Sequence, residues 1–117
     1  MARVRGPVTD RLSLLAAAVE RERCAPRAGS RTARLLARGV PKMAQKVIEE
    51  AGEVSIEALR GDRAALVLES ADLLYNLTVL WSELGIRPAD VWAEMDRREA
   101  LLGLAEKLPK PDPAEVP

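Results

Sequence analysis

Residues 42–77 read KMAQKVIEEAGEVSIEALRGDRAALVLESADLLYNL, and this stretch decides the fold. Apolar residues recur in it at intervals of three and four, which is the spacing of one face of an α-helix. Gly61 and Asp62 interrupt the pattern, because glycine commonly ends a helix and aspartate caps the helix that follows. The stretch therefore predicts two consecutive helices that fold back on each other as a hairpin.

Each of the two predicted helices carries a pair of acidic residues three positions apart, Glu50 with Glu53 and Glu69 with Asp72. Residues at this spacing project from nearly the same side of a helix, so the hairpin would aim four carboxylates at one spot. Converging carboxylates repel one another and require a cation. Because all the ligands are hard oxygens, we expect Mg²⁺, or alternatively Mn²⁺. A single acidic pair is normally a solvated helix face, and the metal-site interpretation depends on the second pair lying in an apolar helix.

The rest of the chain predicts an all-α fold, a helical bundle of about five helices. Proline, glycine and capping residues mark where each helix begins and ends. The expected helices cover residues 10–23, 30–38, 41–60, 62–84 and 88–107. We expect a flexible basic leader at 1–9, one domain at 10–108, and a disordered tail without helix at 109–117, where four of nine residues are proline.

Of the two hairpin helices, the second carries more apolar surface than one partner would cover. In the first of them, Ile48, Ile56 and Leu59 broaden the apolar face, and the second is apolar nearly all round, with Val67 and Leu68 outside its main stripe. A helix of this kind is covered on several sides. We therefore expect a second subunit to cover part of this surface, so that a homodimer completes the bundle.

The composition excludes several classes of function. The chain has no histidine, which removes Ser-His-Asp catalysis, histidine zinc sites and the Glu-x-x-His ligands of di-iron bundles. Its only cysteine, Cys24, cannot form an internal disulfide, and its longest apolar run, Leu12 to Val19, is too short to span a bilayer. We expect a cytoplasmic protein that does not associate with membranes.

Charge is distributed unevenly along the chain. Residues 1–46 hold eleven basic residues against three acidic ones, a net charge of +8, whereas residues 47–117 hold seven against fifteen, a net charge of −8. A basic arm for nucleic acid would produce this pattern, and so would a site where basic groups hold phosphates beside a carboxylate-bound metal. We favour the second interpretation and expect no nucleic-acid partner.

The candidate phosphate ligands lie just before the first acidic pair. Arg31, Arg34 and Arg38 share a helix face, and guanidinium groups match phosphate oxygens in bidentate geometry. Lys42 and Lys46 precede Glu50 on the same helix. These lysines could bind phosphates or form ion pairs with the acids one turn away, and each arginine taken singly is more typical of a solvated surface.

The segment Ser30 to Leu59 and the residues GDRAALVLESADLLYNLTVL that follow Arg60 resemble phosphoribosyl-ATP pyrophosphohydrolases of histidine biosynthesis. The E-E-x-x-E and E-x-x-D motifs are shared by the wider group of all-α, MazG-like nucleotide pyrophosphohydrolases. The T-A-x-L-L-x-x-G stretch from Thr32 and the K-x-x-Q-K-V stretch from Lys42 narrow the resemblance to the phosphoribosyl-ATP branch. The resemblance covers roughly residues 10–107.

The resemblance implies a dimeric enzyme that hydrolyses the α–β phosphoanhydride of phosphoribosyl-ATP to phosphoribosyl-AMP and pyrophosphate. On the matching positions, Glu50, Glu53, Glu69 and Asp72 would bind Mg²⁺, and Glu49 would be a supporting ligand or base. The expected substrate-binding residues are Arg31, Arg34, Lys42, Lys46 and Asn76.

The chain departs from the family pattern at three places. Asn76 stands where many members have histidine, and Arg31 where many have tyrosine. Residues 98–107 read REALLGLAEK, in which Ala100 replaces a glycine and Leu102 a serine. Two alternatives therefore stay open: a MazG-like pyrophosphohydrolase acting on another nucleoside triphosphate, and a non-catalytic helical interaction protein.

Overall fold

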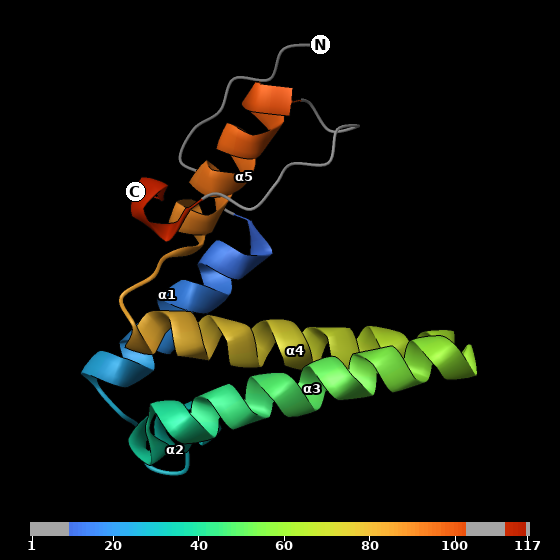
Figure 1. Cartoon of the computed structure of the whole chain (residues 1–117). Coiled ribbons are helices and arrows are strands. Elements are labelled where there is room, and N and C mark those ends of the chain that lie inside the picture. The colour runs from blue at the N-terminus through green and yellow to red at the C-terminus, as the bar shows by residue number, and fades with distance from the viewer. Residues whose placement is uncertain (1–9, 103–111, 117) are drawn as a thin grey trace.

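The structure, a computed structural model of the chain, describes residues 10–102 and 112–116. Over these residues it contains five α-helices and no strand (Figure 1). The helices are α1 (Arg11–Cys24), α2 (Arg31–Arg38), α3 (Val40–Arg60), α4 (Arg63–Glu83) and α5 (Pro88–Leu102). The predicted all-α class is confirmed. The last five residues of the fifth predicted helix, 103–107, lie outside the described residues, as do the leader at 1–9 and residues 109–111 and 117 of the tail.

Capping side chains fix the start of three helices. Asp10, Ser30 and Asp62 each accept a hydrogen bond from the backbone N–H three residues later, at 2.7–3.1 Å. These bonds satisfy N–H groups that have no partner within the helix, which is why these residue types mark helix starts in the sequence.

Two glycines set the directions of the helices that carry the charged residues. Gly61 ends α3 at a φ of 73°, and the N–H of Asp62 bonds to the carbonyl of Glu57 at 3.2 Å, so the chain reverses within one turn. Gly39 separates α2 from α3 at a φ of 90°, a value that residues with a Cβ rarely adopt. One residue therefore sets the angle between the arginine-bearing α2 and the lysine-bearing start of α3.

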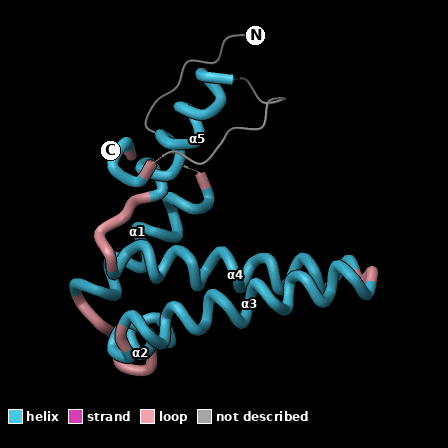
Figure 2. The backbone as a smooth tube through the Cα atoms, in the orientation of Figure 1, coloured by secondary structure: helices cyan, strands magenta, loops and turns pink. Residues whose placement is uncertain are grey.

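The long helices α3 and α4 lie side by side as an antiparallel hairpin, and the other helices gather at one end of it (Figures 1 and 2). There α1 packs on α4, α2 packs on α3, and α5 packs on α1. The core at this end consists of Val19, Met43 and Val79, all fully buried. Around it lie partly buried hydrophobic residues from α1, α2 and α4: Leu15, Leu35, Leu36, Tyr75 and Leu80.

The apolar faces of the hairpin are uncovered in the single chain. On α3, Ile48 and Leu59 are 73% and 89% exposed, and on α4 both Val67 and Leu68 are exposed. By length and composition alone, α4 would qualify as a membrane-crossing helix, although the core helix of a soluble protein passes the same test. Glu69 and Asp72 lie in its middle and meet an acidic residue of α3, which is the arrangement of a helix packed within a protein.

The proline-rich tail contains a single turn of 3₁₀-helix, Pro113–Glu115. The expectation that the tail has no helix is therefore wrong for these three residues. Asp112 accepts a hydrogen bond from the N–H of Ala114 at 2.8 Å, and proline is tolerated in the first turn of a helix because its missing N–H has no partner there.

Candidate functional site

The α3–α4 hairpin brings three carboxylates together: Glu50 from α3, and Glu69 and Asp72 from α4. One oxygen from each lies within 4.8 Å of the other two. Glu50 is only 8% exposed, and its two partners are half-buried. Because Glu69 and Asp72 are three residues apart and Glu50 faces them from the antiparallel helix, the hairpin alone assembles this carboxylate cluster.

The carboxylate cluster lacks the hydrogen bonds that buried acids usually make. Oε2 of Glu50 and Oε2 of Glu69 are both buried without a hydrogen-bond partner. The nearest positive group is Lys46, whose Nζ lies 3.9 Å from Oε1 of Glu50. A buried carboxylate without a partner is costly, so these oxygens are suited to a cation. Hard oxygen ligands alone fit Mg²⁺ or Mn²⁺ better than zinc.

The surroundings of Glu69 raise its pKa to about 7. The main cause is a hydrogen bond shared with Glu53, followed by burial and by the negative charges of Glu53 and Glu50. Glu69 therefore keeps a proton at a pH where an ordinary glutamate has lost it. A bound divalent cation would take the place of that proton.

The other two predicted acids lie at the edge of the carboxylate cluster. Glu53 is exposed, yet it is close enough to Glu69 to share a hydrogen bond with it. Glu49 is also exposed and is not one of the three clustered acids. Of the four predicted metal ligands, the structure therefore brings three together and leaves Glu53 at their edge, whereas Glu49 lies on the exposed surface of α3.

A basic pocket of about 460 Å³ lies between α2, the start of α3 and α4. Lys46 lines this pocket, and its Nζ also lies 3.9 Å from Oε1 of Glu50 in the carboxylate cluster. The pocket and the cluster are therefore adjacent. All five predicted substrate-binding residues line the pocket, together with Arg38, Leu35 and Ala37. An anion in this pocket would meet five basic side chains and would lie next to the carboxylate cluster.

Tyr75 of α4 holds α2 in place, a role that the sequence analysis missed. Its hydroxyl lies 2.6 Å from Oγ1 of Thr32, and the guanidinium of Arg31 lies over its ring, 5.3 Å from the centroid. Arg34 is fixed from another side, because its Nη1 donates to the carbonyl of Gly29 at 3.0 Å. Tyr75 and Thr32 are 43 positions apart, and no local pattern signals such a contact.

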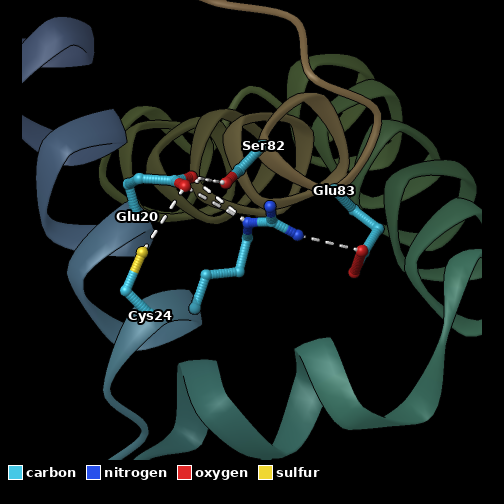
Figure 3. Close-up of polar contacts among 5 residues, drawn as sticks. Glu20, Cys24, Ser82 and Glu83 are labelled. Atoms are coloured by element: carbon cyan, nitrogen blue, oxygen red, sulfur yellow. Dashed lines mark hydrogen bonds and ion pairs between the residues drawn. The ribbon is translucent and has the colours of Figure 1, made fainter.

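A second cavity, of about 520 Å³, lies between α1, the end of α4 and the start of α5. Two of its charged residues, Glu20 and Arg23, are paired with each other (Figure 3), and the third, Arg87, is paired with Asp90 at 3.0 Å. Glu20 accepts hydrogen bonds from Ser82 at 2.9 Å and from Arg23 at 3.3 Å, and Arg23 also pairs with Glu83 at 3.2 Å. The sequence analysis selected none of these residues, and their mutual pairing marks them as structural.

Comparison with known proteins decides the family. The sequence model of the family described as phosphoribosyl-ATP pyrophosphohydrolase matches residues 12–99. This chain belongs to that family. A protein of Rhodopseudomonas palustris named phosphoribosyl-ATP pyrophosphatase 2 is 61% identical over 103 residues, covering 88% of this chain and 79% of the relative. A protein of Bradyrhizobium diazoefficiens with the same name is 60% identical over 103 residues, covering 88% of this chain and 77% of the relative.

A phosphoribosyl-ATP pyrophosphatase of Azospirillum brasilense is 50% identical over 105 residues, which are 90% of this chain and 92% of the relative. The part of the chain that matches the pyrophosphohydrolase family contains the whole carboxylate cluster and the whole basic pocket. It ends at residue 99, immediately before Ala100, the first of the two substitutions in the last helix. Residues 103–107 of that divergent stretch lie outside the described residues.

Proposed function

We propose that this chain hydrolyses phosphoribosyl-ATP to phosphoribosyl-AMP and pyrophosphate in histidine biosynthesis, in a reaction that depends on Mg²⁺. The observation that carries the proposal is that the carboxylate cluster and the basic pocket lie next to each other. Three carboxylates, two of which have a buried oxygen without a hydrogen-bond partner, lie beside a pocket lined by five basic side chains. A triphosphate needs both, because its oxygens bind cations and basic groups together.

Glu50, Glu53, Glu69 and Asp72 hold the metal in this proposal. Mg²⁺ bound there would neutralise phosphate charge and favour attack by water on phosphorus. The chain supplies a proton acceptor for that water from Glu53 or Glu49, since it contains no histidine. Glu53 is the better placed of the two, because it already contacts Glu69 of the carboxylate cluster.

Arg31, Arg34, Lys42 and Lys46 hold the phosphate oxygens, and Asn76 contacts the same substrate from the floor of the basic pocket. Lys46 has a further role in this proposal, because its ammonium group lies between Glu50 of the carboxylate cluster and the basic pocket. By binding oxygens of the substrate near Glu50, it would align the scissile anhydride with the acids.

Pyrophosphate release measured with and without Mg²⁺ tests this function. Phosphoribosyl-ATP should be turned over only with the metal, whereas ordinary and modified nucleoside triphosphates in the same panel should be turned over poorly. Turnover of another triphosphate in preference to phosphoribosyl-ATP would contradict the proposed substrate. No metal-dependent turnover of any nucleotide would contradict the proposed enzyme.

The proposed active form is a homodimer in the cytoplasm, formed from the domain at residues 10–108. The exposed apolar residues of the hairpin support it, because Ile48, Leu59 and Leu68 are too apolar to face water in so small a chain. The substitution Leu59→Glu should shift the molecular mass measured by sedimentation from that of a dimer to that of a monomer. Met95→Glu, the same kind of change at an exposed residue of α5, should leave the dimer intact.

A further inference from the structure

Asn76 has a fixed orientation at the floor of the basic pocket. The residue is only 1% exposed, and its Nδ2 donates to the backbone carbonyl of Asp72 at 2.8 Å. This bond tells the two ends of the amide apart, because only the nitrogen can donate. Oδ1 is therefore the free end, and it is buried without a hydrogen-bond partner.

The free oxygen of Asn76 differs in chemistry from the rest of the basic pocket. The charged residues that line the pocket are all cations, which satisfy the oxygens of phosphates. An amide oxygen is an acceptor and gains nothing from a phosphate oxygen, which is an acceptor too. A ligand that satisfies every polar group of the pocket must therefore carry anionic oxygens and also an uncharged hydrogen-bond donor.

We propose that Oδ1 of Asn76 accepts a hydrogen bond from a hydroxyl of a pentose that bears a phosphate, so that the basic pocket seats a sugar phosphate rather than pyrophosphate alone. This inference rests on the proposed function, whose substrate supplies such a group. At about 460 Å³ the cavity lies in the size range of small-molecule sites.

The position of Asn76 ties sugar recognition to the metal. Asn76 lies one helical turn after Asp72 and bonds to its backbone carbonyl, so the two side chains share one face of α4. A sugar hydroxyl held by Asn76 would fix the distance between the phosphorylated pentose and the carboxylate cluster. Asn76 thereby acts as a specificity-determining residue that distinguishes ribosyl from deoxyribosyl ligands.

Binding of sugar phosphates, measured by NMR titration without turnover, tests this proposal. The probes are ribose 5-phosphate and its 2-deoxy and 3-deoxy analogues, each titrated into the full chain in the presence of Mg²⁺. At least one deoxy analogue should bind the wild-type protein about tenfold more weakly, because it lacks the donor that Oδ1 requires. In Asn76→Ala and in Asn76→Ser the ratio between ribose and deoxyribose affinities should fall towards one.

Gln45→Ala, which removes an exposed amide from α3, is the matched control and should keep the wild-type ratio. Equal affinity of the wild-type protein for all three sugars would overturn the proposal, and this readout does not depend on whether a variant folds. So would an unchanged ratio in Asn76→Ala, or a loss of kcat in that variant with unchanged affinities, which would assign the oxygen to the attacking water instead.

The same titration separates this proposal from the proposed function. Selective binding of ribose 5-phosphate that depends on Asn76, in a protein that does not hydrolyse phosphoribosyl-ATP, would preserve the sugar site and overturn the reaction. Hydrolysis of phosphoribosyl-ATP without any discrimination by Asn76 would preserve the reaction and overturn the sugar site.

Discussion

Two glutamates of this chain have pKa values displaced in opposite directions, and their surroundings show why. Glu94 on α5 accepts hydrogen bonds from Arg97 and Arg98 at 2.9 Å, which lower its pKa to about 2. Glu69 on α4 faces Glu53 and Glu50, which help to raise its pKa to about 7. The first acid has its counter-charges within the chain, whereas the second has mostly other acids.

The same contrast holds for the two cavities. The larger one is lined by one acid and two arginines, all of them paired: Glu20 pairs with Arg23 (Figure 3), and Arg87 pairs with Asp90. The charged residues that line the smaller one are all basic, and the acids lie together in the carboxylate cluster next to it. Unpaired charge, rather than the size of a cavity, is therefore the feature that distinguishes the candidate site from the larger cavity.

The largest effect should come from removing one carboxylate of the cluster. Asp72→Asn should lower the turnover of phosphoribosyl-ATP by a factor on the order of 10³, because the amide weakens metal binding and leaves phosphate charge uncompensated. The variant should remain a folded dimer. Glu94→Gln, a matched change to a paired acid, should keep normal turnover and lower the melting temperature slightly. Normal turnover by Asp72→Asn in a steady-state assay would disprove the metal site.

The pH dependence of stability should differ in sign between the two acids. In the metal-free protein Glu69 holds its proton up to a pH of about 7, whereas a glutamate in the unfolded chain loses it near the ordinary pKa of 4.5. The folded state thus binds more protons between these values, so stability falls as the pH rises from about 4.5 to 7. Glu94 acts in the opposite sense, because its contribution is complete above pH 4.5 and is lost as the pH falls towards 2.

Melting temperatures recorded across this pH range, with Mg²⁺ and with a chelator, measure both effects. The cation should raise the melting temperature most above pH 7, where Glu69 has lost its proton in the metal-free protein. Glu69→Gln should abolish the fall in stability between pH 4.5 and 7. A melting temperature of the metal-free wild type that stays level over that window would contradict the repulsion described for this site.

Removing a basic side chain should affect the two cavities differently. Lys42→Ala should raise KM for phosphoribosyl-ATP about tenfold, because a charge-assisted hydrogen bond to phosphate is lost. Arg87→Ala removes a cation from the larger cavity, where it is paired with Asp90 at 3.0 Å, and should leave KM unchanged. If both variants bind substrate equally well, the basic pocket does not hold phosphate.

The smallest effect should come from the contact that holds α2. Tyr75→Phe keeps a ring beneath Arg31 but loses the hydrogen bond to Thr32, so KM should rise about threefold with kcat unchanged. Ser82→Ala likewise loses one hydrogen bond, to Glu20 in the larger cavity, and should lower only the melting temperature. A KM shift of equal size in both variants would assign Tyr75 a general structural role.

Local signals in the sequence were sufficient to predict the helices. The caps at Asp10, Ser30 and Asp62 and the glycine stop at Gly61 act on their immediate neighbours, so each can be read without knowing the fold. The meeting of Glu50 with Glu69 and Asp72 was predictable for a related reason. These acids lie on consecutive helices joined by a tight turn, which leaves one antiparallel arrangement.

Contacts between distant segments could not be predicted in the same way. Tyr75 meets Thr32, and Glu20 meets Ser82 62 positions along the chain, only because α1, α2 and α4 converge on one core. The sequence pattern also could not show that Ile48 and Leu59 stay exposed in a single chain, since periodicity marks an apolar face without telling what covers it.

The turn at Gly61 and Asp62 has a kinetic consequence. The turn brings together acids that lie on consecutive helices. Forming the contacts between these acids therefore closes only a short loop, so these contacts can form early in folding. Repulsion between those acids would then already raise the free energy of the folding transition state. Divalent cations should accordingly speed the folding of this hairpin more than they slow its unfolding.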